Sequence, residues 1–130
     1  MNADEIHMLR AIELAKRGEG LTRPNPPVGA VLVQDGEIIA EGWHKKAGGP
    51  HAEVACLQSV TGTLKSASLY VTLEPCSTQG KTPPCTDLIL EKGIGRVVVS
   101  VVDRNPEHAG QGLELLRNAG VEVVSGVCEA

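Results

Sequence analysis

The chain has 130 residues, a formal net charge of −4 and a hydrophobic fraction of 42%, with one tryptophan, one tyrosine and no phenylalanine. This length is typical of a single domain, and its core must be filled by valine, leucine, isoleucine and alanine. The twelve lysines and arginines are scattered, and there are too few aromatic rings to stack on bases. A nucleic-acid partner is therefore not expected.

Two further classes are disfavoured by the distribution of apolar residues. No stretch approaches the ~18 consecutive apolar residues of a membrane span, and residues 1–18 lack the basic and apolar regions of a signal peptide. We expect a cytoplasmic protein with no membrane partner. Its four cysteines are then more typical of metal ligands or buried thiols than of disulfides.

The first predicted element is a helix over about residues 4–17. Ile6, Leu9 and Leu14 recur near helical spacing and are expected to form its apolar face. Residues 28–43 read as a hairpin that turns at Asp35-Gly36, between two apolar runs.

The second half of the chain alternates helices and strands. Helices are predicted over residues 51–60, 82–93 and 110–120, and strands over residues 67–74, 96–102 and 121–127. Together with the hairpin, this order predicts an α/β domain: a mixed five-stranded sheet with helices on both faces and parallel crossovers after residue 51. Ligands of such sheets bind where the carboxyl ends of strands meet the N-termini of helices.

Three side chains of metal-binding type fall at such positions. His51 opens a predicted helix, Cys76 follows a predicted strand, and Cys85 lies at the start of the next helix. One imidazole and two thiolates leave the fourth position of a tetrahedral zinc open, as in catalytic sites. Glu53, two residues after His51, can move protons without binding the metal. Two cysteines are expected to be structural, Cys56 and Cys128.

The motif His-x-Glu followed by Pro-Cys is similar to the signature of zinc deaminases, whose two cysteines are usually separated by two residues. Here eight residues separate Cys76 from Cys85. On these residues alone, a helix-capping core histidine with two unrelated buried thiols is the alternative.

Four longer stretches carry a more specific resemblance: "TRPNPPVGAV", "GWHKKAGGPHAEV", "TLEPCSTQGKTPPC" and "DRNPEHAGQGLELLRNAGVEV". In order and spacing they closely resemble the deaminase domain of the bifunctional riboflavin-biosynthesis deaminase/reductase. The resemblance implies a cytidine-deaminase-like three-layer α/β/α sandwich that contains zinc and forms at least a homodimer. It also implies hydrolytic deamination of 2,5-diamino-6-(5-phosphoribosylamino)pyrimidin-4-one, a small pyrimidine ribotide, to the 5-amino-uracil ribotide.

The resemblance also assigns roles by position. His51, Cys76 and Cys85 would bind zinc, Glu53 would shuttle protons, Asn25, His44 and Lys81 would contact substrate, and Asp103 and Asn105 would lie at its ribose-phosphate end. Lys81 precedes a predicted helix N-terminus, which suits a phosphate. Asn25 is held between prolines, which limits the entropy it loses on binding. For all five substrate contacts the alternative is a local role, in a turn, a cap or a solvated loop.

Some features depart from the family pattern. Thr78 stands where the family usually has histidine, and Arg104 replaces a usual proline. No reductase domain is expected within residues 1–130, so a separate protein performs the reduction or the domain belongs to a longer chain. These departures keep two alternatives open: a zinc deaminase of another base or nucleoside, such as guanine, cytosine or a modified pyrimidine, and a catalytically silent zinc domain that serves as a scaffold.

Overall fold

The computed structural model describes residues 1–21, 27–45, 49–58, 60–62, 64–75, 85–101 and 110–128. The elements in these ranges are, in chain order, α1 (Ala3–Lys16), β1 (Gly29–Gln34), β2 (Glu37–Trp43), α2 (Ala52–Leu57), β3 (Ser68–Leu73), α3 (Cys85–Lys92), β4 (Arg96–Val101), α4 (Gln111–Asn118) and β5 (Glu122–Ser125). The predicted order of helices and strands is confirmed. Of the helices in the described ranges, none has the length and apolarity needed to cross a bilayer.

The strands form one mixed sheet in the order β2-β1-β3-β4-β5. β1 pairs antiparallel with both of its neighbours, whereas β4 pairs parallel with β3 and β5. Parallel neighbours need a crossover connection, and α3 and α4 lie between the parallel strands in the sequence. The predicted five-stranded mixed sheet, with its parallel half after residue 51, is confirmed.

The β1–β2 hairpin turns at Asp35-Gly36, as predicted. Their φ angles are 53° and 79°. A two-residue turn with both residues in the left-handed region has a twist that matches that of the flanking strands. Because β1 is antiparallel to both neighbours, the start of β1 lies at the same edge of the sheet as the ends of β2 and β3. We call this the carboxyl edge.

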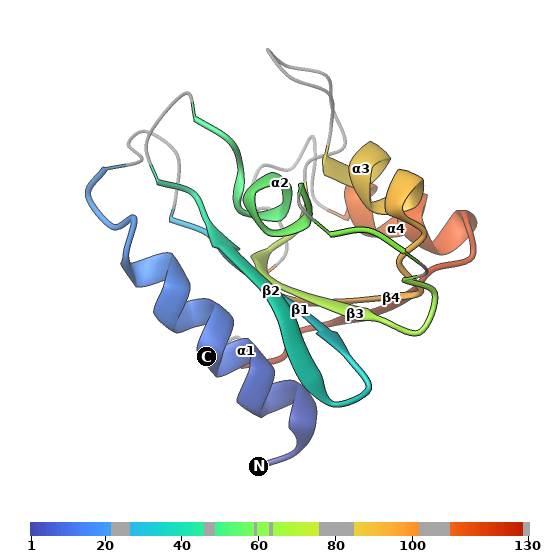
Figure 1. The fold of residues 1–130 in the computed structure, drawn as a ribbon, viewed down its shortest axis with the longest axis horizontal. Helices are drawn as coiled ribbons and strands as arrows, with labels where there is room; N and C mark the ends of the chain where they lie inside the picture. Colours follow the sequence, from blue (N-terminus) through green and yellow to red (C-terminus); the bar gives the residue numbers. More distant parts are fainter. Residues whose placement is uncertain are drawn as a thin grey trace.

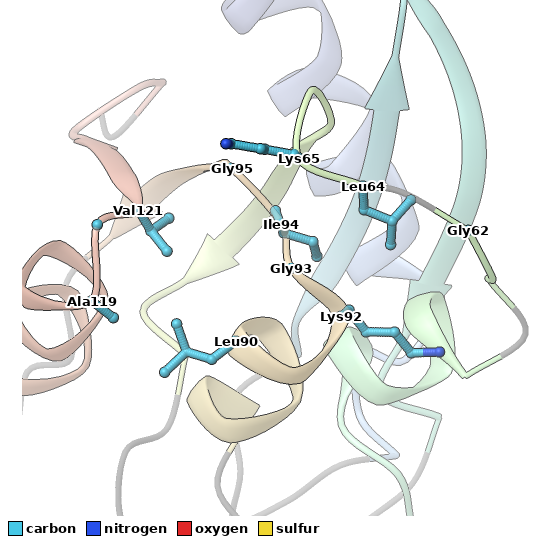
Figure 2. Close-up of a pocket in the computed structure, with 11 residues that line it drawn as sticks. Gly62, Leu64, Lys65, Leu90, Lys92, Gly93, Ile94, Gly95, Ala119 and Val121 are labelled. Carbon is cyan, nitrogen blue, oxygen red and sulfur yellow. The ribbon is translucent and has the colours of Figure 1, made fainter.

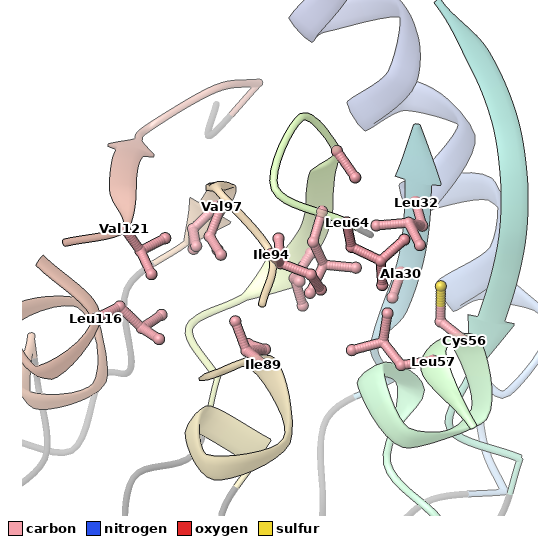
Figure 3. Close-up of a cluster of buried hydrophobic side chains, with 14 of the residues drawn as sticks. Ala30, Leu32, Cys56, Leu57, Leu64, Ile89, Ile94, Val97, Leu116 and Val121 are labelled. Carbon is pink, nitrogen blue, oxygen red and sulfur yellow. The ribbon is translucent and has the colours of Figure 1, made fainter. Parts of the chain in front are cut away.

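The sheet is covered on both faces. α1 lies on one face, and α2, α3 and α4 lie on the other (Figure 1). Side chains from α2–α4 and the sheet form the larger core cluster, part of which is shown in Figure 3. The central residues of β4, Val97, Val98 and Val99, are fully buried, as expected of a strand covered on both faces. The three-layer α/β/α arrangement is confirmed.

The predicted apolar face of α1 is wrong for two of its three residues. Ile6 and Leu9 are 53% and 44% exposed, whereas Leu14 is buried as predicted, together with Met8 and Ala11. The sequence-based choice of face passed over Met8 and the small residue Ala11. A small side chain lets a helix approach a sheet closely, so alanine can occupy the buried stripe.

Polar contacts also fix the orientation of α1. Asn2 caps its start: the Glu5 backbone N–H donates to Asn2 Oδ1 over 2.9 Å, and Glu5 Oε1 accepts from the Asn2 backbone N–H over 3.1 Å. Arg10 Nε donates to Glu41 Oε2 of β2 over 2.6 Å, and this contact lowers the pKa of Glu41. The capping box fixes where the helix begins, and the Arg10–Glu41 contact joins one side of the helix to β2.

A partly buried network of polar side chains joins α1 to three strands. Arg96 of β4 donates from both terminal nitrogens to the Asp4 carboxylate, over 2.8 and 2.7 Å, and from Nε to Glu122 of β5 over 2.6 Å. The Tyr70 hydroxyl of β3 donates to Asp4 Oδ1 over 2.7 Å. The Arg96 contact lowers the pKa of Asp4 to about 2, against the opposing effect of burial. Burial and the Asp4 contact raise the pKa of Tyr70 to about 12.

We expect Asp4→Asn to lower the free energy of unfolding by roughly 2 kcal/mol at pH 7. A carboxyl whose pKa is lower in the folded state stabilises above its unfolded pKa, here 3.8, and this stabilisation is lost as the pH falls toward 2. The difference between the two proteins in urea denaturation should therefore shrink between pH 4 and pH 2. Glu19→Gln, which removes an exposed carboxylate, is the control and should cost less than about 0.5 kcal/mol. A difference that stays constant down to pH 2 would contradict the prediction.

Candidate active site

The N-termini of α2 and α3 meet near the carboxyl edge of the sheet. His51 is the residue before α2 and has an extended backbone, with φ −68° and ψ 162°. Cys85 is the first residue of α3 and is 1% exposed. His51 Nδ1 lies 3.4 Å from Cys85 Sγ. Two predicted ligands that are far apart in the sequence are thus brought into contact.

This donor pair fits a zinc ion. A tetrahedral ion with a nitrogen ligand at about 2.0–2.1 Å and a thiolate at about 2.3 Å holds the two donor atoms about 3.6 Å apart. The observed 3.4 Å between His51 and Cys85 is close to that separation. An imidazole and a thiolate are also two of the donors that zinc prefers.

The third predicted ligand, Cys76, lies outside the described residues. The chain is described up to Pro75, directly before it, at the carboxyl end of β3. Within the described ranges no three His, Cys, Asp or Glu side chains are grouped to hold a metal. The described part of the site therefore contains two of the three predicted ligands.

Glu53 lies in the first turn of α2, two residues after His51, and is only 4% exposed. Cys56, further along the same helix, is buried in the core cluster. Burial, together with the negative charge of Glu53, raises the pKa of the Cys56 thiol to about 12. A thiol with this pKa stays protonated near neutral pH, so the prediction that Cys56 is structural is confirmed.

His44 follows β2 and is 3% exposed. Its backbone N–H donates to the Val28 carbonyl over 3.0 Å, and its ring Nδ1–H donates to the Pro50 carbonyl over 2.9 Å. The ring meets that of His51 edge-on, with 5.4 Å between centroids. The other ring nitrogen, Nε2, is buried without a hydrogen-bond partner among the described residues. His44 is thus held beside the His51–Cys85 pair, with one buried polar atom that no described residue satisfies.

The remaining predicted substrate contacts lie outside the described residues: Asn25, Lys81, Asp103 and Asn105, as do Thr78 and Arg104.

Two residues near the site were missed by the sequence analysis. Glu74, directly before Pro75, is 6% exposed and accepts backbone hydrogen bonds from the start of α4. Gly42 of β2 lies against α2, where an added Cβ would be 2.5 Å from Cys56 N and 2.7 Å from Ala52 O. Two features of the sequence could have pointed to these residues: Glu74 is a carboxylate at the end of a predicted apolar strand, and Gly42 is a glycine within a predicted strand.

A cavity of about 440 Å³ lies at the opposite edge of the sheet. It is lined by the loops that precede β3, β4 and β5, including Leu64, Ile94 and Val121 (Figure 2). None of the predicted site residues lines it. The chemistry predicted from the sequence therefore belongs to the carboxyl edge and not to this cavity.

Comparison with known proteins assigns the family. Residues 1–101 match the family described as the cytidine and deoxycytidylate deaminase zinc-binding region. The chain belongs to this family. The prediction of a zinc deaminase, made from the His51-x-Glu53, Pro75-Cys76 and Cys85 motif, is confirmed.

Relatives within this deaminase family confirm the more specific resemblance. The chain is 56% identical over 126 residues to riboflavin biosynthesis protein RibD of Aquifex aeolicus, covering 97% of this chain and 35% of that protein. It is 48% identical over 124 residues to the diaminohydroxyphosphoribosylamino-pyrimidine deaminase of Buchnera aphidicola, covering 95% of this chain and 84% of that protein. The chain thus spans about a third of the length of the RibD proteins that it matches.

A solved structure has the same fold. The diaminohydroxyphosphoribosylaminopyrimidine deaminase/5-amino-6-(5-phosphoribosylamino)uracil reductase of Thermotoga maritima superposes with a TM-score of 0.92 at 56% identity, over 98% of this chain and 37% of that one.

Gly42→Ala should weaken zinc binding by at least about tenfold, measured by competition with a chromogenic chelator. The added methyl group would meet the backbone of α2 and push this helix, with His51 at its N-cap, away from the sheet. This should lower the free energy of unfolding by about 1–3 kcal/mol. Gly95→Ala is the matched control, because its methyl group would meet the Lys65 carbonyl at the opposite edge. If both variants weaken zinc binding equally, the effect is general destabilisation and the prediction is wrong.

Proposed function

We propose that this domain catalyses the hydrolytic deamination of 2,5-diamino-6-(5-phosphoribosylamino)pyrimidin-4-one. Water adds to C2 of the pyrimidine, the 2-amino group leaves as ammonia, and a carbonyl remains in the 5-amino-uracil ribotide. The observation that carries the proposal is the 3.4 Å contact of His51 with Cys85, two residues along the chain from the buried Glu53. The identity to deaminases of riboflavin biosynthesis supports the choice of substrate.

His51, Cys85 and, by the resemblance, Cys76 would hold zinc. When bound, zinc would act as a Lewis acid that lowers the pKa of a water molecule to about 7. Three protein ligands leave room for that water, as in other catalytic zinc sites. His51 and Cys85 fix the place of the reaction because each is anchored at the start of a helix.

Glu53 would move the protons. Its carboxylate takes a proton from the attacking water and delivers it to the ring nitrogen. It then takes the second proton, from the hydroxyl group now on C2, and delivers it to the departing amine as the carbonyl forms. Burial favours this role, because electrostatic interactions are stronger where water is excluded. Because Glu53 lies in the first turn of α2, two residues after His51, its carboxylate would stay close to His51 and Cys85.

His44 would orient the substrate. Its hydrogen bond to Pro50 holds the ring, and Nε2 is the polar atom that remains for the ligand. A buried polar atom without a partner is costly unless a ligand or water satisfies it. Binding of the ribotide would supply that partner.

The other contacts follow the resemblance alone. Lys81 would meet the phosphate, Asn25 the pyrimidine edge, and Asp103 and Asn105 the ribose-phosphate end. A lysine before a helix N-terminus suits an anion because the helix dipole and backbone N–H groups add to its charge.

We also propose that residues 1–130 act as one deaminase domain, supported by the single sheet with helices on both faces. The reduction that follows in the bifunctional relatives would be carried out by other residues or by a separate protein. As the resemblance implies, the domain would work as at least a homodimer, and we propose that it does so in the cytoplasm.

Glu53→Gln should lower kcat for ammonia release from the ribotide by at least about 100-fold, because an amide cannot accept the proton from water. Zinc content, measured in the same samples, should be unchanged. Glu91→Gln, at an exposed position of α3, is the control and should retain activity within about twofold. Unchanged turnover in Glu53→Gln would overturn the catalytic role of Glu53.

The same assay with cytidine, cytosine and guanine tests the substrate. Release of ammonia from the ribotide alone is expected. Release from an unphosphorylated base, with the ribotide untouched, would show that the zinc chemistry is right and the proposed substrate wrong.

His44→Asn should raise KM for the ribotide about tenfold while kcat changes less. The asparagine amide can still donate to the Pro50 carbonyl but lacks an atom at the position of Nε2. Steady-state kinetics with zinc-loaded protein measure the two constants separately. An unchanged KM would show that Nε2 does not contact the substrate.

A further inference from the structure

Glu74 is a buried carboxylate at the point where β3 ends. Its side chain accepts two hydrogen bonds from backbone N–H groups, one on each oxygen: Gly110 N–H to Oε1 over 2.9 Å and Gly112 N–H to Oε2 over 2.8 Å. Its own backbone N–H donates to the Val101 carbonyl over 2.8 Å. One residue thus joins the ends of β3 and β4 to the start of α4.

The start of α4 depends on this carboxylate. Its N-cap residue, Gly110, has a φ of 79° and provides no side-chain cap. The first N–H groups of a helix lack partners within the helix, and a carboxylate near them interacts favourably with both the N–H groups and the helix dipole. Glu74 fulfils that role from 36 residues away in the sequence.

A close backbone contact reinforces the junction. A Cβ built on Gly112 would collide with the Pro75 carbonyl oxygen and would lie 3.2 Å from Glu74 Oε2. Glycine therefore lets α4 come directly against the Glu74-Pro75 segment. The junction holds two chain segments together, one through side-chain hydrogen bonds and one through backbone contact.

Both segments lead directly to proposed active-site residues. Cys76, a proposed zinc ligand, is bonded to Pro75. Residues 102–109, which include the proposed substrate contacts Asp103 and Asn105, connect Val101 to Gly110. The Glu74 carboxylate and its backbone N–H thus bind the residues at both ends of that segment, Val101 and Gly110.

We propose that Glu74 is a positioning residue of the active site: it holds Pro75, which precedes the proposed zinc ligand, at one fixed separation from Val101 and Gly110, which flank the proposed substrate contacts. The proposal rests on the proposed function for the identity of the substrate. Glu74 acts through its neighbours, so its loss should affect zinc retention and substrate affinity together. A carboxylate is needed because both oxygens accept; glutamine has one acceptor and would turn an NH₂ group toward the second N–H.

The test compares Glu74→Gln with the wild-type chain and with Glu114→Gln. Glu114 is an exposed carboxylate in the first turn of α4, so its replacement controls for loss of charge near the helix dipole. Zinc release to an excess of chelator is followed without substrate, and KM and kcat for the ribotide are measured with saturating zinc. In Glu74→Gln, zinc release should be about tenfold faster and KM about tenfold higher, with a smaller change in kcat. Glu114→Gln should stay within about twofold of wild type in all three.

Zinc release and KM both within twofold of wild type in Glu74→Gln would overturn the proposal, whatever the change in melting temperature. If Glu74→Gln does not fold, Glu74→Asp gives the same readouts, because it keeps the charge and shortens the reach to Gly110 and Gly112. The zinc measurement also separates this proposal from the proposed function. A wild-type chain that leaves the ribotide untouched refutes the function, while faster zinc release in the variant still supports the role of Glu74 at the metal segment.

Discussion

The close packing of α2 on β2 determines where the chemistry of this domain can occur. Gly42 leaves no side chain between the strand and the helix backbone, so α2 lies directly on the sheet. The helix then presents His51 to Cys85 of α3, on the same face, at 3.4 Å. The two residues come into contact only because both helices pack on the same face of one sheet. The contact between His51 and Cys85 is therefore a property of the three-layer packing and not of either helix alone.

The two ends of the sheet differ in their polar content. At the carboxyl edge the fold buries His44, Glu53 and Glu74. Burying polar groups is unfavourable unless hydrogen bonds, a metal or a ligand compensates. At the opposite end, where β4 begins, the Asp4–Arg96 ion pair joins α1 to the sheet. Three of the buried polar side chains thus lie at the carboxyl edge, where the proposed chemistry would take place.

Most of the fold could be predicted from local patterns. The Asp35-Gly36 turn and the apolar run of β4 have short-range signatures, and both predictions are confirmed. The buried face of α1 was predicted wrongly for two of its three residues, because the choice between alanine and larger apolar residues depends on how closely the sheet can be approached. Glu74 was missed for a similar reason: its partners are backbone N–H groups 36 and 38 residues away, and any residue type can provide these.

The sequence by itself determined the kinds of donor atom, their spacing and the family. These depend on residue identity and on short stretches of chain, which a sequence states directly. Only the tertiary structure decided that His51 faces Cys85, that His44 Nε2 is buried without a hydrogen-bond partner among the described residues, and that Glu74 holds the start of α4. Each of these results from contacts between segments distant in the chain. Such contacts depend on strand pairing and on how closely layers pack, which no local pattern encodes.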